Sequence, residues 1–446
     1  SLVESLGDPV TGALAEDDQQ LLKFHGSYQQ YDRESAEARR QAKLEPAYSF
    51  MIRARLPGGI CKPAQWLALD ELSERYANGT LRLTSRQSFQ LHGVLKSDLK
   101  ATIAGINASL LDTMSACGDV NRNVMSGPGA AISPLHAEVQ RRALELSEHL
   151  LPRTRAYHEI WLDGEKLATG QEEEPILGKS FLPRKFKIAL VVPPVNDVDV
   201  FTQDLGFIAI AEGGRLAGFN LVAGGGMGST HGDVRTFARL GDVIGFFAPD
   251  RLLAVAEAVV TTQRDFGDRQ DRKHARLKYT IADRGVDWFR AEVERRLGFA
   301  LDEPQAFLFT TTGDVFGWAR DIEDRWHLTL RIESGRVADR GDARLRSGLA
   351  RIAQIHRGHF RLTPNQNLTI ADVAAQDRAQ IDALVGEFGL GLHLRARPIQ
   401  LESLACVALP TCPLAMADAE RYLPPATAVI AALMERHGLG AEPLLF

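Results

Sequence analysis

The sequence predicts a mixed fold of helices and strands, in which two related halves flank an inserted α/β segment. The hexapeptides RLTSRQ at 82–87 and RLTPNQ at 361–366 share Arg, Leu, Thr and Gln in register, and each follows a Gly three residues before its Arg. Their separation far exceeds the period of a solenoid repeat. We interpret them as parts of two halves that pair in space; a coincidental similarity of two ordinary strands is the alternative.

The elements around each hexapeptide repeat in the same order. Alternating apolar residues and turn signals predict strand, helix and strand in the first half, over 48–56, 63–77 and 81–93. The same order is expected in the second half, over 326–332, 345–356 and 360–373. In the first half, Pro57-Gly58-Gly59 and Asn78-Gly79 supply the breaks between these elements.

The stretch LRLTSRQSFQLHG, at 81–93, carries the first indication of function. Read as one alternating strand, it places on a single face the polar side chains of Arg82, Thr84, Arg86, Gln90 and His92. Arg engages carboxylates and phosphates in bidentate fashion, so such a face suits a ligand with several acidic groups. A solvated face of an amphipathic strand is the alternative.

The segment between the halves reads as α/β, with a helix beginning near Ser133 and Pro134 and a buried strand at 187–195. A further strand, 219–223, enters GGGMG, and a helix is expected over 251–260. The glycine run fails the dinucleotide pattern G-x-G-x-x-G, because Ser229 or His231 stands at the third glycine. We expect a tight turn there that lets the backbone approach a ligand.

The two ends differ from this central part. Residues 1–47 are polar and charge-rich, and we expect an extended arm with a short helix. A last helix is expected over 426–437, ended by Gly438. The first residues have neither a basic nor an apolar stretch of the kind found in secretory signals, and they lack an initiator Met.

Composition narrows the class of protein. The 446 residues are 45% hydrophobic and 24% charged, with a net charge of −5, which gives no indication of a nucleic-acid or membrane partner. No apolar run is long enough for a spanning helix. Four cysteines in so long a chain form no disulfide framework and indicate a reducing cytoplasm.

Two further groups of residues could carry chemistry. Cations gather near turns and strands, and as a set suit a polyanionic cofactor and a small anionic substrate: Arg53, Arg55, Arg82, Arg86, Arg122, Arg184, Lys185, Lys187, Arg264, Arg269, Arg272 and Arg276. For any one of them, an exposed charge or a structural ion pair is the alternative. Cys406 and Cys412 form a C-x5-C pair that could bind zinc or an iron–sulfur cluster, although two thiolates complete neither site, or could be inert.

Nine segments, in order, resemble the signatures of the sulfite and nitrite reductase superfamily, and in particular the hemoprotein subunits of assimilatory sulfite reductase. They are KFHGSYQQYDRE, RLPGG, LRLTSRQSFQLHGV, CGDVNRNVM, LPRTRAYHEIWLDGEK, EEEPILGKSFLPRKFK, AVAEAVVTTQRDFG, FRLTPNQNLTIA and ACVALPTCPLAMADAERYLP. The resemblance runs from about residue 20 to the last residue.

The resemblance implies a pseudo-twofold pair of ferredoxin-like half-domains around siroheme. It also implies an inserted α/β domain and the start of a second α/β domain that binds the cluster. The corresponding boundaries are an arm at 1–47, half-domains at 48–115 and 321–393, the inserted domain at 116–320, and the incomplete cluster-binding domain at 394–446.

The implied reaction is the six-electron reduction of sulfite to sulfide at a siroheme coupled to a [4Fe–4S] cluster, in sulfate assimilation and cysteine biosynthesis. Electrons would come from a flavoprotein subunit that uses NADPH, with ferredoxin as the alternative donor. Two other functions stay open, namely a siroheme nitrite reductase and a non-catalytic tetrapyrrole-binding protein.

The resemblance also implies roles for single residues. Anion binding and proton supply fall to Arg53, Arg122, Lys185 and Lys187. Siroheme contacts fall to Arg82, Thr84, Arg86, Gln90, His92, Asn121, Asn365 and Gln366. Cluster ligation falls to Cys406 and Cys412. Nitrite reductases of the superfamily tend to have Asn where this chain has Lys187, so Lys187 favours sulfite.

The chain departs from the family pattern in its cysteines. The family has a later C-x3-C pair that completes the cluster and bridges it to the siroheme iron, and no such pair occurs before Phe446. We therefore expect the sequence to be a fragment of a longer enzyme. Taken alone, the 446 residues are expected not to assemble the coupled centre and to be inactive.

Overall fold

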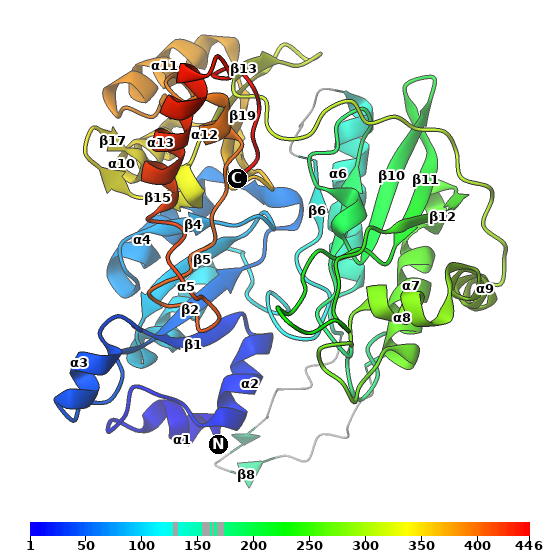
Figure 1. Cartoon of the computed structure of the whole chain (residues 1–446), viewed down its shortest axis with the longest axis horizontal. Helices are drawn as coiled ribbons and strands as arrows, with labels where there is room; N and C mark the ends of the chain where they lie inside the picture. Colours follow the sequence, from blue (N-terminus) through cyan, green and yellow to red (C-terminus); the bar gives the residue numbers. More distant parts are fainter. Residues whose placement is uncertain (128–132, 154–160, 163–164, 167–173) are drawn as a thin grey trace. The chain divides into compact units, whose positions relative to one another are not determined.

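The computed structural model describes residues 1–127, 133–153, 161–162, 165–166 and 174–446. Parts of two motifs, LPRTRAYHEIWLDGEK and EEEPILGKSFLPRKFK, lie outside these residues. The chain forms two compact units, which Figure 1 shows in sequence colours. Unit 1 comprises Ser1–Ala116, Pro128–Ser133 and Gly313–Phe446, and unit 2 comprises Cys117–Gly127 and Pro134–Thr312.

Unit 1 contains two antiparallel sheets of five strands each. The first has the order β1 (Ser27–Tyr31), β2 (Tyr48–Ala54), β5 (Phe89–Val94), β4 (Leu81–Leu83) and β15 (Arg336–Val337). The second has the order β13 (Gly317–Arg320), β14 (Trp326–Leu330), β19 (Leu368–Val373), β18 (His359–Leu362) and β3 (Ile60–Cys61). The two orders correspond strand for strand, which confirms the predicted pseudo-twofold pair of half-domains.

The halves are joined because each gives a short strand to the edge of the other's sheet. β3, from the first half, pairs with β18, and β15, from the second half, pairs with β4. Both strands follow a sharp turn with a left-handed glycine, Gly59 at φ 72° and Gly335 at φ 69°. A Cβ on Gly59 would lie 2.6 Å from the carbonyl oxygen of Leu362, and one on Gly335 would meet that of Leu83. Glycine is required at both positions, because each backbone passes so close to the opposite half.

The stretch 81–93 is a hairpin rather than the single strand that its alternation predicts. β4 ends at Leu83, a turn follows, and β5 begins at Phe89; the second half breaks in the same way between β18 and β19. The turns place Gln87 at φ 50° and Gln366 at φ 64°. The prediction failed because the polar residues of the turn continue the alternation of polar and apolar side chains seen in the strand. The hydrophobic pattern therefore does not show where β4 ends.

A single apolar core extends through both halves of unit 1. Trp66, in α4, is fully buried, and its ring lies 5.4 Å from that of Phe89 in β5 and 4.8 Å from that of Phe360 in β18. One side chain thus packs on a strand from each sheet. The helices α4 (Pro63–Tyr76) and α10 (Leu345–Ile355) pack together, in agreement with the helices predicted at 63–77 and 345–356.

The remaining helices of unit 1 lie outside the strand–helix–strand units. They are α1 (Leu2–Gly7), α2 (Glu16–Phe24), α3 (Ala36–Gln41), α5 (Leu99–Ala108), α11 (Arg378–Glu387), α12 (Pro398–Leu401) and α13 (Leu423–Arg436). A two-stranded ribbon is formed by β16 (Asp339–Arg340) and β17 (Ala343–Arg344). The first 47 residues form more than an extended arm, because β1 pairs with β2 and both Leu14 and Leu22 enter the core.

Unit 2 is built on a mixed five-stranded sheet. Its order is β12 (Asp242–Phe247), β11 (Arg215–Ala223), β10 (Leu205–Glu212), β9 (Ile188–Val191) and β6 (Met125–Ser126). β9 is parallel to both of its neighbours, and the other pairs are antiparallel. The helices are α6 (Pro134–His149), α7 (Leu252–Phe266), α8 (Leu277–Arg284) and α9 (Val286–Leu297), and β7 (Trp161–Leu162) pairs with β8 (Glu165–Lys166).

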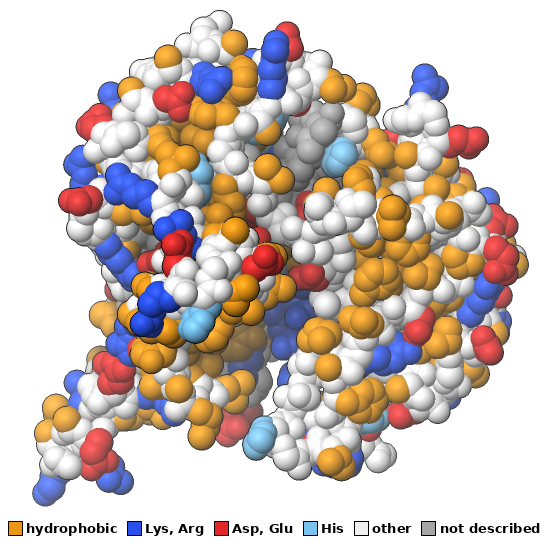
Figure 2. Space-filling view, turned by 45° about the horizontal axis from the view of Figure 1, so that its top comes forward, with side chains coloured by type: hydrophobic (Ala, Val, Ile, Leu, Met, Phe, Trp, Pro, Cys, Tyr) orange, Lys and Arg blue, Asp and Glu red, His pale blue; other side chains and the backbone are white. Residues whose placement is uncertain are grey.

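The predicted elements of unit 2 are present with shifted ends. The strand expected at 187–195 stops at Val191, before Pro193 and Pro194, which cannot donate ladder hydrogen bonds. The helix expected at 251–260 continues to Phe266. Within the described residues, every helix is too short or too polar to cross a bilayer. Figure 2 shows acidic and basic side chains interspersed on the face in view.

Candidate functional site

A row of polar side chains crosses the first sheet of unit 1. In register, Arg53 on β2 lies opposite Gln90 on β5, Gln90 opposite Arg82 on β4, and Arg82 opposite Arg336 on β15. Cross-strand partners project from the same face of a sheet, so the structure brings these four side chains together. We call them the cationic row. Sequence reasoning found three of its members and missed Arg336, because pairing across the two halves brings that residue in.

His92 lies two residues beyond Gln90 on the same face of β5. It is 5% exposed, and its Nε2 lies 3.4 Å from Oε1 of Gln90. Burial, together with the charges of Arg336, Arg82 and Arg53, lowers the pKa of His92 well below its usual range. The imidazole is therefore neutral at physiological pH and offers one donor and one acceptor rather than a charge.

The second half lacks most of this row. When the two halves are aligned in sequence on Gly59 and Gly335, Arg53 corresponds to Thr329. In the second sheet, Thr329 lies opposite Thr369, and Thr369 lies opposite Arg361. The two threonine hydroxyls lie 2.9 Å apart and bond to each other. Arg361 is buried, and burial lowers its pKa to about 10. One half of the pair thus carries the cation-rich face, and the other carries mostly hydroxyls.

Thr84 organises the turn that carries Arg86. Its hydroxyl lies 2.8 Å from that of Ser88 and accepts backbone hydrogen bonds from Arg86 and Ser88, each 3.2 Å long. Arg86 itself is half-buried. The structure therefore gives Thr84 a role in shaping the turn and leaves Arg86 near its tip.

The equivalent turn in the second half holds Asn365 and Gln366. Asn365 donates to Asp314 at 3.2 Å, and Asp314 also accepts from Thr363 at 2.7 Å and from Asn367 at 2.8 Å. Burial raises the pKa of Asp314. Gln366 donates through Nε2 to the carbonyl of Ala405 at 3.1 Å. Asn365 is therefore engaged within its own half, and Gln366 reaches the residue before Cys406.

Unit 2 gathers a second set of predicted residues around Phe186. The segment of Asn121 and Arg122 forms a parallel bridge with Phe186, and the Arg122 amide donates to the Phe186 carbonyl at 2.8 Å. Lys185 and Lys187 flank Phe186, so all four predicted residues of this unit lie close together. Burial, and then the charges of Arg122, Arg276 and Arg184, lower the pKa of Lys185 to about 8.

The buried carboxylate of Asp204 holds the backbone of Lys187 and the guanidinium of Arg276. Asp204 accepts two hydrogen bonds from the guanidinium of Arg276, at 2.9 and 2.8 Å, and one from the Lys187 amide, at 2.9 Å. Its side chain is 1% exposed. Sequence reasoning selected Arg276 as a cation but missed Asp204, because one aspartate after a loop gives no sign that it will be buried opposite an arginine.

Other basic residues of unit 2 hold the protein's own backbone. Arg264 donates to the carbonyl of Ile176 at 2.7 Å, and Arg269 to that of Phe181 at 2.7 Å. Lys278 donates to the carbonyls of Gly226, Gly228 and Phe237, the first two at 3.0 and 2.6 Å. These three cations are structural ties. Arg264 and Arg269 were in the predicted cation set, and their structural role matches its alternative; Lys278 was not in that set.

The GGGMG run makes a close backbone approach of the predicted kind, but to the protein itself. Gly224 has φ 83°, and a Cβ on Gly225 would collide with the carbonyl of Phe201 and lie 2.6 Å from that of Gln203. The amides of Gly224 and Gly225 donate to the carbonyls of Asp204 and Gln203, both at 2.9 Å. The turn therefore packs behind the loop that carries Asp204.

The four cysteines fall into two classes. Cys61 and Cys117 are fully buried, and burial strongly raises the pKa of the Cys61 thiol, which disfavours the thiolate there. Cys406 is exposed and Cys412 is half-buried, and all four are free thiols. Among the described residues, no group of three or more His, Cys, Asp or Glu side chains could hold a metal ion.

The residues present fit the two implied cofactors to different degrees. In the described part of the chain, three buried polar atoms of predicted cofactor residues have no hydrogen-bond partner, namely His92 Nδ1, Asn121 Oδ1 and Gln366 Oε1. Buried polar atoms of this kind are normally satisfied. His92 Nδ1, when it carries the proton, could donate to a carboxylate of the macrocycle, whereas the two amide oxygens are acceptors and need a donor other than a carboxylate. For the cluster, Cys406 and Cys412 could supply two of the four thiolates that a [4Fe–4S] centre takes.

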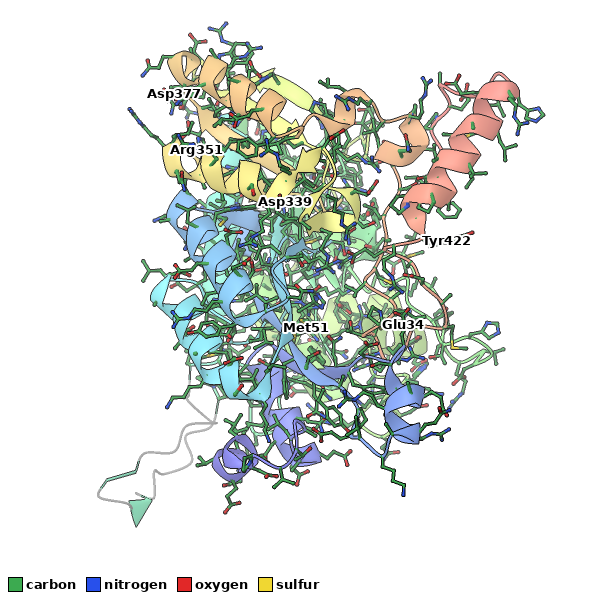
Figure 3. The ribbon with its side chains drawn as sticks, turned by 90° about the vertical axis from the view of Figure 1, so that its left-hand side faces the viewer. Glu34, Met51, Asp339, Arg351, Asp377 and Tyr422 are labelled. Carbon is green, nitrogen blue, oxygen red and sulfur yellow. The ribbon has the colours of Figure 1, made fainter. Side chains whose placement is uncertain are left out.

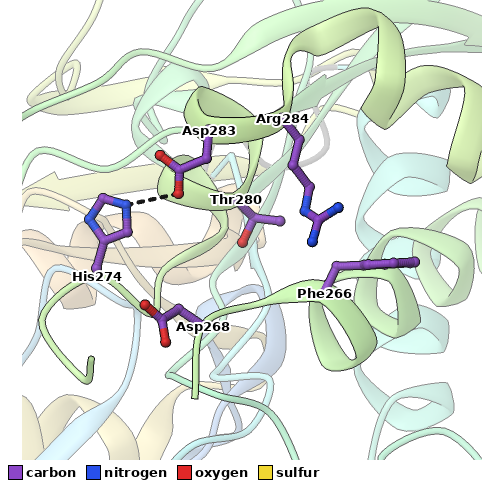
Figure 4. Close-up of a pocket in the computed structure, with 6 residues that line it drawn as sticks. All are labelled: Phe266, Asp268, His274, Thr280, Asp283 and Arg284. Atoms are coloured by element: carbon purple, nitrogen blue, oxygen red, sulfur yellow. Dashed lines mark hydrogen bonds and ion pairs between the residues drawn. The ribbon is translucent and has the colours of Figure 1, made fainter. Parts of the chain in front are cut away.

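A separate pocket of about 350 Å³ lies in unit 2, lined by Phe266, Asp268, His274, Thr280, Asp283 and Arg284. Figure 4 shows His274 beside Asp283, and their contact is 2.9 Å long. Arg284 lies over the ring of Phe266 at 4.9 Å. None of the predicted site residues lines this pocket.

Comparison with known families matches most of the chain. Residues 145–301 match the family described as "Nitrite and sulphite reductase 4Fe-4S domain". Residues 42–109 and 320–388 both match the family described as "Nitrite/Sulfite reductase ferredoxin-like half domain". The second family thus occurs twice, at the two halves of unit 1.

Individual relatives match the chain over its whole length. The sulfite reductase [NADPH] hemoprotein beta-component of Myxococcus xanthus is 59% identical over 445 residues, which cover 100% of this chain and 79% of that protein. The protein of the same name from Xanthomonas campestris is 57% identical over 447 residues, with the same shares. Among solved structures, the Mycobacterium tuberculosis NirA protein has the same fold, with a TM-score of 0.74, 22% identity, and coverage of 98% of this chain and 75% of that one. The chain belongs to the family of sulfite reductase [NADPH] hemoprotein beta-components.

Proposed function

We propose that this protein reduces sulfite to sulfide with six electrons, at a siroheme coupled to a [4Fe–4S] cluster. The observation that carries the proposal is the 59% identity to a sulfite reductase hemoprotein over the full chain. In the balanced reaction, sulfite takes up six electrons and seven protons and gives hydrosulfide and three waters. Siroheme and the cluster, when bound, would supply the electrons, and the protein's residues would bind the anion, orient it and deliver protons.

The first sheet of unit 1 supports the binding of the macrocycle. The half-buried Arg86 provides a guanidinium that suits a carboxylate of siroheme. Arg82 and Arg336 of the cationic row are instead engaged by Glu420. His92, neutral and buried, adds a directional hydrogen bond without a further charge. We assign siroheme contacts to Arg86, Gln90 and His92, and a supporting role to Thr84 through the turn that it shapes.

Substrate binding and proton delivery are assigned to Arg53, Arg122, Lys185 and Lys187. Cations favour the charged form of an oxyanion and hold it for successive loss of oxygen. Lys185, with a pKa of about 8, is protonated at neutral pH yet close enough to neutrality to release its proton. Arg122 lowers the pKa of Lys185 through its charge, so it serves both binding and acidity.

The electron donor proposed is a flavoprotein subunit that oxidises NADPH, since the related proteins are named NADPH-dependent hemoprotein components. Ferredoxin is the alternative donor. Dependence on NADPH supports a cytoplasmic location for the reaction and a place in the assimilation of sulfate into cysteine.

The proposal is tested first by the cofactors of the full-length gene product, purified from cells that make siroheme. We expect siroheme absorption bands, together with iron and labile sulfide in the ratio of one cluster per siroheme. Protein that folds but contains neither cofactor would overturn the proposal.

Lys187 gives a sharper test of substrate preference. Replacing Lys187 by Asn removes one charge-assisted hydrogen bond of about 1.5–3 kcal/mol, so the ratio of sulfite to nitrite turnover should fall by roughly tenfold or more. Lys179, an exposed lysine in the same segment, provides the matched control, and Lys179→Asn should leave the ratio unchanged. Equal ratios in wild type and Lys187→Asn would remove the role assigned to Lys187, and a wild type that prefers nitrite would support a nitrite reductase instead.

A further inference from the structure

Two buried arginines in unit 1 share one carboxylate that comes from the C-terminal part of the chain. Glu420 accepts a hydrogen bond from Arg82 Nε at 3.1 Å and two from Arg336, at 2.7 and 2.9 Å. All three side chains are at most 8% exposed. Arg82 and Arg336 are neighbours in the cationic row, so Glu420 neutralises one end of that row.

Arg82 also bonds to the chain on the N-terminal side of the two cysteines, whereas Glu420 lies on their C-terminal side. Its Nη2 donates to the carbonyl of Ala405 at 2.7 Å, and that carbonyl accepts a second hydrogen bond from Gln366 at 3.1 Å. Ala405 directly precedes Cys406, and Glu420 lies eight residues after Cys412. The segment between them, residues 405–420, is thus fixed at both ends on the same arginine. We call it the cysteine segment.

These contacts depart from the pseudo-twofold symmetry of the half-domains. Gln87, the counterpart of Gln366, donates to the carbonyl of Leu362 in the opposite half at 2.9 Å, whereas Gln366 donates to Ala405. The counterpart of Arg336 is Ile60, which carries no charge. Among the residues that hold the cysteine segment, Arg336 thus has no charged counterpart, and Gln366 makes a different contact from its counterpart Gln87.

We propose that Glu420, with Arg82 and Arg336, is a positioning residue that fixes the cysteine segment on the half-domain pair and so places Cys406 and Cys412 for cluster ligation. The ligation rests on the proposed function, and the fixing of the segment is independent of it. Removal of one partner from a buried ion pair is costly, because it leaves the remaining charge desolvated and unpaired.

A second tie to the same segment provides the control. Arg421, next to Glu420, pairs with Glu34 at 2.5 Å, but these side chains are 47% and 48% exposed. Figure 3 shows Glu34 in the segment before α3 and Tyr422 at the start of α13. Exposed pairs contribute little to stability, so Glu34→Gln removes the carboxylate that pairs with Arg421, just after the cysteine segment, without unpairing a buried charge.

The first experiment needs no cofactor. In the 446-residue chain, hydrogen exchange is measured at amides within the cysteine segment, such as that of Cys412, which donates to Ala408 at 2.9 Å. Glu420→Gln should speed exchange there by about tenfold or more, and Glu34→Gln should change it little. Unchanged exchange in Glu420→Gln would overturn the inference. If that variant fails to fold, Glu420→Asp, which keeps the charge on a shorter side chain, must show intermediate exchange, and wild-type exchange in Glu420→Asp would likewise overturn it.

The second experiment uses the full-length holoprotein. Loss of the Glu420 charge should shift the reduction potential of the cluster to a more positive value, Glu420→Asp should restore it in part, and Glu34→Gln should leave it unchanged. A potential that is equal in all variants would reduce Glu420 to a structural role. Absence of the cluster from wild-type protein would contradict the proposed function instead, and the exchange measurement would still decide the fixing of the segment.

Discussion

Lys185 shows how position lowers the pKa of an ordinary lysine toward the range of a general acid. A free lysine holds its proton too tightly to deliver it near neutral pH. Burial and the neighbouring Arg122, Arg276 and Arg184 destabilise its charged form, Asp204 opposes them, and the pKa falls to about 8. The sequence RKFK shows only Arg184, whereas the burial and the charges of Arg122 and Arg276 arise from parts of the chain far from Lys185.

The shift predicts a pH dependence. Lys185 is active when protonated, so the rate of sulfite reduction should fall as pH rises through about 8. Lys185→Arg keeps the charge at higher pH and should move this limb upward. Lys185→Gln should lower kcat by roughly 10²–10⁴, the usual contribution of a general acid. Steady-state profiles of the three proteins test this, and a limb that stays in place in Lys185→Arg would assign it to another group.

Single residues were predictable where the chemistry needs a residue type, and missed where burial decides the role. Arg53, Arg82 and Arg122 were selected from the sequence as cations. Glu420 and Asp204, which hold the cations in place, were missed, because each meets its arginine through a contact between distant parts of the chain. Arg82 was expected to contact a cofactor, and the structure shows its side chain bonded to Glu420 and Ala405.

At the scale of elements, the loop between β9 and β10 determines where Lys187 lies. Asp204 precedes β10, Lys187 precedes β9, and the strands run parallel, so one carboxylate can receive both the Lys187 amide and Arg276. The carbonyl group of Lys187 is also held, because it accepts a hydrogen bond from the Leu205 amide at 3.1 Å.

Asp204→Asn should therefore destabilise unit 2. Loss of a buried partner costs about 3–5 kcal/mol, which should appear as faster hydrogen exchange throughout β9 and β10. Asp250→Asn is the control, since Asp250 is 73% exposed and pairs with Arg251 at 3.6 Å, and it should change the free energy of opening by less than about 1 kcal/mol. Equal effects of the two substitutions would show that Asp204 does not hold these strands.

Elements with a regular spacing of apolar residues and clear turn residues at their ends were predicted well. They include α4, α10 and the repeated order of strand, helix and strand. The hairpins were not, because Thr84 and Thr363 satisfy turn amides with side-chain oxygens while keeping the alternation of a strand. Gln87 and Gln366 adopt left-handed backbone angles at positions where glycine is usual, so the residue types gave no sign of a turn.

At the scale of the whole molecule, unit 1 is one core made from two copies of the same half-domain. The exchanged strands β3 and β15 and the ring of Trp66 between Phe89 and Phe360 make each half part of the other's packing. The duplication was predictable from the hexapeptides, but the strand exchange was not, since two-residue strands leave no periodic signal.

Trp66→Ala should consequently loosen both halves. The substitution removes a fully buried aromatic side chain, and we expect a loss of about 3–5 kcal/mol in the free energy of unfolding. Urea denaturation measures the loss, and hydrogen exchange should rise in β5 and β18 together. Tyr422→Ala, at a side chain that is 66% exposed, should have little effect. Exchange that rises in only one of the two strands would contradict a shared core.

The central claim is that Arg53, Arg122, Lys185 and Lys187 serve the six-electron reduction of sulfite. The most direct test supplies the full-length holoprotein with sulfite and a reduced one-electron dye under anaerobic conditions, and counts both the dye oxidised and the sulfide formed. Our account predicts one sulfide for every six dye molecules oxidised, with the yield lost in Lys185→Gln. Dye oxidation without sulfide, or no sulfite-dependent oxidation by protein that contains both cofactors, would contradict it.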